Sequence, residues 1–192
     1  MIFSNPQFLC STWRRPEAPD GVPLVVFAGR SNAGKSSVIN ALCGGRFARV
    51  SRDPGRTRMI NLFQLAGGAV LADLPGYGYA KISHTERASW AAPVDRFLRS
   101  PKICGMVIIV DCRRGLGNLD LLLLDGFVAR PVLVILSKAD KINREKLILA
   151  QREAEKTLSE LSPSAVVLPF SATQKTGVDK ARAVLSGWIS RD

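Results

Sequence analysis

The chain has 192 residues, of which 46% are hydrophobic and 22% are charged, a composition that fits one globular domain and excludes disordered and fibrous proteins. The sequence shows neither an apolar run of about 20 residues nor the charged-then-apolar start of a signal peptide, so we expect a cytoplasmic protein without membrane contact. Lys and Arg total 27 against 16 acidic residues, and the net charge of +11 favours a polyanionic partner such as RNA, the open alternative being a charge that serves only solubility.

Six apolar runs, taken in chain order, predict six β-strands. They cover residues 22–28, 59–65, 69–72, 103–110, 131–136 and 165–168. The first, fourth and fifth runs do not alternate with polar residues, as expected of parallel strands that are covered on both faces. Little more than Gly67 and Gly68 separates the second run from the third. This hairpin spacing leaves no room for a helix, so one edge strand should be antiparallel.

Helices are predicted between the other strands. In residues 147–161 apolar side chains recur every three or four positions, the period of a helix with one apolar face. Thr176 and Asp179 have the spacing of a capping box before a final helix. These patterns predict an α/β fold with a six-stranded, mostly parallel sheet, one antiparallel edge strand and helices on both faces. The domain should span residues 22–192, after an N-terminal extension of residues 1–21.

A phosphate-binding loop (P-loop) follows the first predicted strand. Its glycines let backbone N–H groups turn towards phosphates, and the next helix adds its positive end at the same point. Lys35 is expected to reach the β- and γ-phosphates, and the hydroxyl of Ser36 to bind Mg²⁺. The predicted nucleotide contacts are Gly29, Arg30, Ser31, Asn32, Ala33, Gly34, Lys35, Ser36 and Ser37.

A base-binding motif, Ser137-Lys138-Ala139-Asp140, follows the fifth predicted strand. The carboxylate of Asp140 can accept two hydrogen bonds, from guanine N1–H and from the 2-amino group, whereas adenine offers no such pair of donors. The stem of Lys138 can lie over the base, and the backbone of residues 170–172, which are Phe170, Ser171 and Ala172, can donate to guanine O6. The predicted base is therefore guanine.

Two further segments have the spacing of switch loops. Asp73-Leu74-Pro75-Gly76 ends the third predicted strand, where Asp73 can hold Mg²⁺ through water and the Gly76 N–H can meet the γ-phosphate. Before the second strand, Thr57 can complete the Mg²⁺ shell while the γ-phosphate is present. Its neighbours in the predicted nucleotide site are Gly55, Arg56, Arg58 and Met59. Lys35, Thr57 and Gly76 are the expected catalytic residues, and Ser36, Thr57 and Asp73 the expected metal ligands.

These motifs resemble the EngB family of bacterial GTPases, over the chain from about residue 22 to its end. The most specific string is Asp73-Leu74-Pro75-Gly76-Tyr77-Gly78-Tyr79-Ala80. The resemblance implies a Ras-like fold that binds GTP or GDP with Mg²⁺. It also implies a role in assembly of the large ribosomal subunit, needed for normal cell division and septation, with ribosomal RNA or a subunit precursor as partner. We expect a monomer.

Several residues bear on the mechanism. Tyr77 stands where Ras-type enzymes carry a water-orienting glutamine, so intrinsic hydrolysis should be slow and stimulated by a partner. Asn32 resembles the P-loop asparagine of potassium-stimulated GTPases, although it could merely brace the loop. Five arginines crowd the first switch and predict RNA binding that depends on the nucleotide, with a solvated loop as the alternative. They are Arg46, Arg49, Arg52, Arg56 and Arg58.

Two other function classes share part of this pattern. A P-loop ATPase or kinase shares the phosphate loop, but Asp140 and Thr57 argue against it. An RNA-binding module with a purely structural nucleotide is disfavoured because the switch residues form a complete set. The prediction is therefore a GTP-hydrolysing molecular switch.

Overall fold

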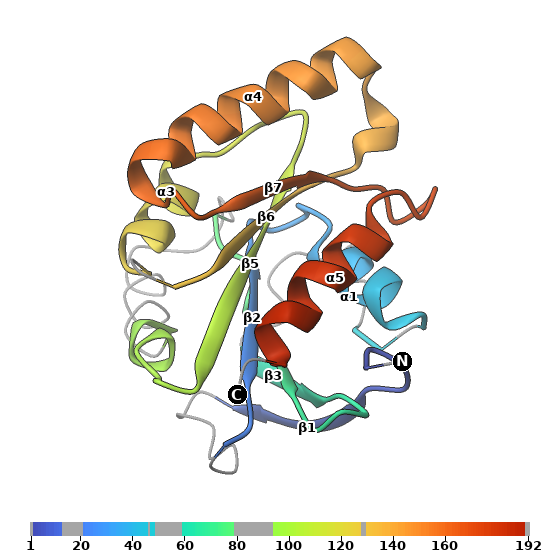
Figure 1. Cartoon of the computed structure of the whole chain (residues 1–192), viewed down its shortest axis with the longest axis vertical. Helices are drawn as coiled ribbons and strands as arrows, with labels where there is room; N and C mark the ends of the chain where they lie inside the picture. Colours follow the sequence, from blue (N-terminus) through green and yellow to red (C-terminus); the bar gives the residue numbers. More distant parts are fainter. Residues whose placement is uncertain are drawn as a thin grey trace.

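A seven-stranded sheet forms the centre of the molecule (Figure 1). The computed structural model describes residues 2–12, 21–45, 47–48, 59–78, 94–127 and 130–190. The strand order is β1-β3-β4-β2-β5-β6-β7. The strands are β1 (Gln7–Thr12), β2 (Leu24–Gly29), β3 (Ile60–Gln64), β4 (Val70–Asp73), β5 (Ile103–Asp111), β6 (Val132–Ser137) and β7 (Val166–Pro169). Within the described residues the helices with assigned bounds are α1 (Lys35–Cys43), α3 (Asn118–Asp125), α4 (Arg144–Leu161) and α5 (Val178–Ile189), with a 3₁₀ turn, η1 (Ala139–Lys141). Residues 94–98 are also helical.

The parallel centre of the sheet is confirmed. β2 pairs in parallel with β4 and β5, and β6 pairs in parallel with β5 and β7. Alternate residues of β2 point to two cores: Val25 and Phe27 pack with α1 and α5, and Leu24 and Val26 with α3 and α4. Helices cover both faces in Figure 1, which explains why these strands lack polar alternation.

The predicted count of six strands is one too low. β1, which lies within the predicted N-terminal extension, pairs antiparallel with β3 at the edge of the sheet. β3 pairs antiparallel with β4 as predicted, so the antiparallel part contains two strands, β1 and β3. β1 escapes detection because nearly all of its residues are exposed, so it lacks the buried apolar run that marks the other strands. Nearby, Phe3 is buried in the core beside α1 and α5.

The two predicted helices are present, with one correction. α4 buries Ala154 and Leu158 from the predicted apolar stripe. α5 begins after Gly177, not at a capping box, because Thr176 is engaged in a bridge with Ser171. Gly177 has a φ of 81°, and a Cβ there would lie 2.4 Å from the carbonyl oxygen of Pro169, so the position requires glycine. Within the described residues, no helix is both long and apolar enough to span a bilayer.

Candidate nucleotide site

The parallel strands bring four of the predicted motifs to one edge of the sheet. β2, β4, β6 and β7 all run in the same direction, so the loops that follow them leave from the same edge. These loops carry the P-loop, the Asp73–Gly76 segment, the base-binding motif and residues 170–172, in that order. Ligands of open α/β sheets bind at this carboxyl edge, and the topology therefore assembles the predicted site.

The P-loop has the backbone that a phosphate cradle requires. Asn32 and Gly34 have φ values of 64° and 99°, so the chain turns through the left-handed region twice before α1 begins at Lys35. Gly29 lies against β5, where a Cβ would be 2.7 Å from the carbonyl oxygen of Ile109. The ammonium of Lys35 forms an ion pair with the carboxylate of Asp73, and both side chains are largely buried. The ion pair therefore brings the lysine of the P-loop into direct contact with the aspartate of the predicted second switch.

The Asp73–Gly76 segment is fixed directly on the P-loop. The N–H of Ser31 donates to the carbonyl of Tyr77 at 2.7 Å, and the N–H of Tyr77 donates to the carbonyl of Gly29 at 3.3 Å. Between these bonds, Gly76 lies so close that a Cβ would be 3.2 Å from Cα of Ser31. The backbone of Gly76 therefore lies beside the phosphate loop, as its predicted role requires.

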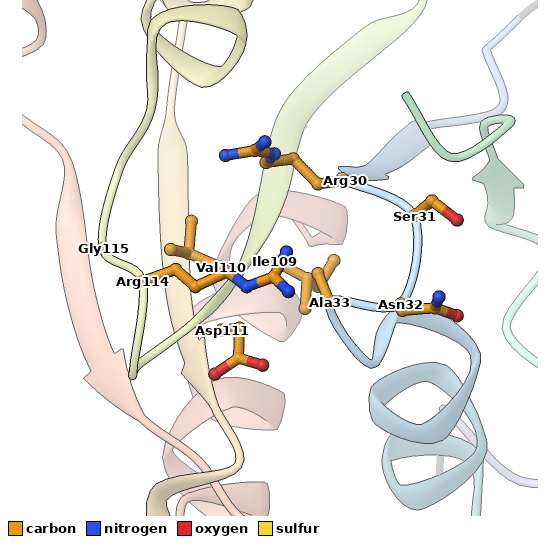
Figure 2. A pocket seen from close by; sticks show the side chains of 9 residues that line it. All are labelled: Arg30, Ser31, Asn32, Ala33, Ile109, Val110, Asp111, Arg114 and Gly115. Carbon is orange, nitrogen blue, oxygen red and sulfur yellow. The ribbon is translucent and has the colours of Figure 1, made fainter. Parts of the chain in front are cut away.

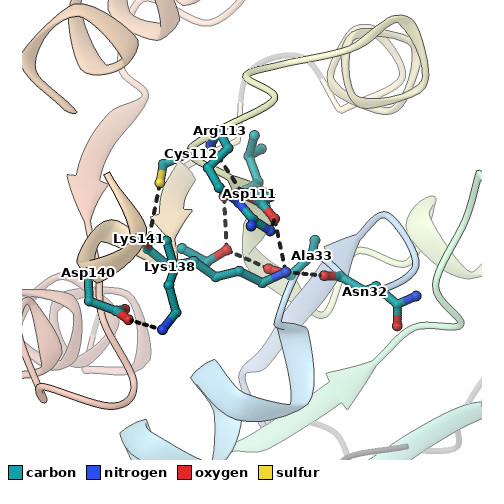
Figure 3. Close-up of polar contacts among 10 residues, drawn as sticks. Asn32, Ala33, Asp111, Cys112, Arg113, Lys138, Asp140 and Lys141 are labelled. Atoms are coloured by element: carbon teal, nitrogen blue, oxygen red, sulfur yellow. Dashed lines mark hydrogen bonds and ion pairs between the residues drawn. The ribbon is translucent and has the colours of Figure 1, made fainter. Parts of the chain in front are cut away.

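The base-binding motif is also bonded to the P-loop. The hydroxyl of Ser137 donates to the carbonyl of Ala33. The ammonium of Lys138 donates to the carbonyl of Asn32 at 2.6 Å and to Asp111 at 2.9 Å, as Figure 3 shows. Lys138 has a left-handed backbone, with a φ of 59°, and its side chain reaches back to the P-loop. The base-binding and phosphate-binding loops are thus held together by side chains.

Asp140 is prepared to accept hydrogen bonds. The hydroxyl of Ser171 donates to it at 2.7 Å, and the ammonium of Lys141 lies 3.2 Å away. The hydrogen bond from Ser171, followed by that from Lys141, lowers the pKa of the Asp140 carboxyl despite a partial loss of solvent. The side chain is therefore ionised at neutral pH and acts only as an acceptor. β6 and β7 thus bring together Asp140 and Ser171, which are far apart in the sequence.

Asp111 is a site residue that the sequence motifs did not indicate. It ends β5 and accepts hydrogen bonds from Lys138 and from the guanidinium of Arg113, the latter at 2.6 Å (Figure 3). Burial disfavours its charged form, but the bonds from Arg113 and Lys138 prevail and hold the pKa of this carboxyl well below its usual range. The signal available in the sequence is its place at the end of a buried strand, the same position that Asp73 occupies.

A pocket lies between the P-loop and the end of β5 (Figure 2). Its wall on one side comes from the P-loop and on the other from the end of β5 and the loop that follows. Two guanidinium groups, of Arg30 and Arg114, contribute to its lining together with the carboxylate of Asp111. The complete lining is Arg30, Ser31, Asn32, Ala33, Ile109, Val110, Asp111, Arg114 and Gly115.

The remaining predicted residues divide into two groups. Ser36 and Ser37 lie half-buried in the first turn of α1, and Met59 is exposed directly before β3. The hydroxyl of Ser36 and the carboxylate of Asp73 are hard oxygen donors of the kind that Mg²⁺ prefers, so these residues fit that ion. The predictions for the first switch and its arginines lie outside the described residues. These are Arg46, Arg49, Arg52, Gly55, Arg56, Thr57 and Arg58.

Known proteins are similar to this chain in sequence and in fold. A family model described as 50S ribosome-binding GTPase matches residues 24–138. The probable GTP-binding protein EngB of Neisseria gonorrhoeae is 40% identical over 194 aligned positions, covering 98% of this chain and 93% of the relative. The probable GTP-binding protein EngB of Nitrosococcus oceani is 43% identical over 175 positions, covering 89% and 88%. A crystal structure of a probable GTP-binding protein engB matches with a TM-score of 0.68 at 26% identity, covering 86% of this chain and 98% of that one.

Proposed function

Because this chain belongs to the EngB family of GTP-binding GTPases, we propose that it is a slowly hydrolysing switch whose GTP form acts in assembly of the large ribosomal subunit. The observation that carries the proposal is that Asp140, Lys138 and the P-loop lie together at one edge of the sheet. A link to normal cell division and septation, a cytoplasmic location and a monomeric state belong to the same proposal.

The described residues suggest how the site handles GTP. Asp140 would accept from N1–H and the 2-amino group of guanine, while Lys138 would cover the base. Lys35 would leave Asp73 and neutralise the β- and γ-phosphate oxygens, and the N–H of Gly76 would donate to the γ-phosphate. Mg²⁺, held by Ser36 and Asp73 together with Thr57, would neutralise further charge on the same oxygens. The protein thus contributes positioning and charge, which phosphoryl transfer chiefly needs.

Tyr77 supports the proposal of slow intrinsic hydrolysis. It occupies the position after Gly76, but its side chain is only 7% exposed and its hydroxyl donates to Asp120 at 2.6 Å. Burial, followed by the nearby Asp120, raises the pKa of the phenol, so this group is neither a base nor a ligand for an attacking water. A partner would therefore supply the missing stabilisation of the transition state.

The proposed partner is ribosomal RNA within a large-subunit precursor. Two observations support it: the net charge of +11 and the description of the matching family as 50S ribosome-binding. We expect the protein loaded with a non-hydrolysable GTP analogue to bind large-subunit precursors about tenfold more tightly than the GDP form, within the usual range of coupling free energies. Cosedimentation across a salt series would measure the affinity and its salt slope.

Thr57→Ala supplies the matched variant for this experiment. It removes a proposed switch hydroxyl and should abolish the difference between the two nucleotide forms while leaving the basic residues in place. Equal affinity and equal salt slope of the wild type in both forms would contradict the coupling, and would favour an RNA-binding module with a structural nucleotide.

A potassium ion beside the phosphates is a further part of the proposal. Asn32 is exposed at the P-loop, and Lys138 donates to its backbone carbonyl, so its side-chain amide is not needed for that bond. We expect GTP turnover to be several-fold faster in KCl than in NaCl at equal ionic strength, through added positive charge at the transition state. Asn32→Ala should remove the difference, and equal wild-type rates in both salts would exclude the potassium site.

A further inference from the structure

A buried hydrogen bond joins the second switch to helix α3. The hydroxyl of Tyr77 donates to Oδ1 of Asp120 at 2.6 Å. Asp120 has no exposed surface, and its second oxygen accepts the N–H of Gly117 at 2.8 Å, which caps the start of α3. One carboxylate therefore bonds both the tyrosine that follows Gly76 and the backbone of the helix terminus.

The surroundings of this bond restrict its position. The ring of Tyr77 packs in the core that α3 and α4 cover. The guanidinium of Arg30, from the P-loop, reaches the same place: a Cβ on Gly117 would be 3.0 Å from it, and a Cβ on Gly78 would be 3.3 Å from it. Leu119 of α3 also approaches Gly78, at 3.4 Å from the same added atom. The P-loop, the second switch and α3 thus converge on Tyr77 and Asp120.

The backbone of Tyr77 transmits this restriction to Gly76. Two main-chain hydrogen bonds, to Ser31 and to Gly29, hold the backbone of Tyr77 against the P-loop. The bond to Gly29 is long, at 3.3 Å. The phenol bond to Asp120 adds a third fixed point on the same residue, about one side-chain length from its backbone, so Tyr77 is held through its main chain and through its side chain. The Gly76 N–H belongs to the preceding Pro75–Gly76 peptide, which is joined to Tyr77 through Cα of Gly76, so a shift of Tyr77 would move that N–H relative to the phosphate loop.

We propose that Tyr77 and Asp120 are positioning residues that hold the N–H of Gly76 in place for the γ-phosphate. The inference rests on the proposed role of Asp73–Gly76 as the second switch. It assigns a task to the tyrosine that stands in the position of a catalytic glutamine, and it makes α3 part of the machinery that distinguishes GTP from GDP.

The test is the ratio of two affinities, for a non-hydrolysable GTP analogue and for GDP, measured by calorimetry. Tyr77→Phe removes only the phenol oxygen, and Asp120→Ala removes its acceptor. Each should weaken binding of the analogue about tenfold, as expected for loss of a hydrogen bond to a charged group, and should leave GDP affinity unchanged because GDP has no γ-phosphate. Combining the two changes should cause no further loss, since both remove the same bond.

Two further variants separate positioning from general stability. Asp120→Asn keeps one hydrogen bond to the phenol in either orientation of its amide, so it should retain most of the wild-type ratio although the cap of α3 is weakened. Ala154→Gly destabilises the buried face of α4, which packs on β7 at the far edge of the sheet from β4, and should lower the melting temperature without changing the ratio.

The outcomes are distinct. An unchanged ratio in folded Tyr77→Phe and Asp120→Ala, with tight guanine nucleotide binding, would overturn the positioning role and leave the proposed switch intact. A wild-type protein that binds neither nucleotide would overturn both. A ratio that falls in Ala154→Gly as it falls in Tyr77→Phe would show that the effect comes from stability alone and would equally overturn the positioning role.

Discussion

Asp140→Asn is expected to lower the affinity for GTP by about a thousandfold, because the site then faces guanine with an amide donor opposite the 2-amino donor. The same change should improve binding of xanthosine triphosphate, whose carbonyl at this position can accept from the new amide while N1–H donates to its oxygen. Ser171 would still bond residue 140 from β7. Competition against labelled GTP by the three triphosphates of guanosine, xanthosine and adenosine measures the whole effect.

The matched control for this prediction is Asp179→Asn. Asp179 lies on α5 with a side chain that is 97% exposed, so the same chemical change should leave the nucleotide preference as it is. A variant of Asp140 that still prefers guanosine triphosphate would show that another group selects the base. Wild-type protein from which ATP displaces GTP at similar concentration would instead favour the ATPase or kinase class.

Lys35→Met is expected to have two effects. Affinity for GTP should fall about a hundredfold, because the β- and γ-phosphates lose a charged donor. The free energy of unfolding, measured by denaturant without nucleotide, should fall by about 3 kcal/mol, because the buried carboxylate of Asp73 loses its counter-charge. Calorimetry with GTP and urea unfolding followed by circular dichroism measure the two quantities separately.

A second substitution distinguishes these effects. Adding Asp73→Asn to Lys35→Met removes the unpaired charge and should restore most of the lost stability without restoring GTP binding. Lys180→Met, on the exposed face of α5, is the control for the same change of side chain and should alter neither quantity. Recovery of GTP affinity in the double variant would show that Lys35 acts through folding stability and makes no direct contact with phosphate.

The sequence predicts the centre of this fold better than its edges. β2, β5 and β6 are buried on both faces, and continuous apolar runs follow directly from that burial. β1 lies at an edge with most side chains in solvent, so its sequence carries little constraint that a pattern could reveal. The cap of α5 cannot be predicted for a related reason. Glycine is required at position 177 because the carbonyl of Pro169 lies close by, and a contact with another element produces no recognisable spacing of residues near the helix start.

The candidate site shows the same division. The P-loop and Asp140 could be predicted because their chemistry depends on residue types at fixed spacing along the chain. Asp111 and Asp120 could not, because each acts by accepting a bond from a distant residue, Lys138 and Tyr77 respectively. Sequence offered only weak hints: one carboxylate ends a buried strand, and the other lies three residues after Gly117, in the spacing of a helix cap.

The bonds from Ser137 and Lys138 to the P-loop have a thermodynamic consequence for the ligand. These bonds link the two loops that we propose bind opposite ends of the nucleotide, so ordering one loop should also order the other. Guanosine and pyrophosphate, offered as separate fragments, should each bind more strongly in the presence of the other. The first fragment to bind orders both loops, so the second fragment binds without a further loss of conformational entropy. The covalent bond between guanosine and the phosphates in GTP would then strengthen binding beyond the cooperativity between the two fragments.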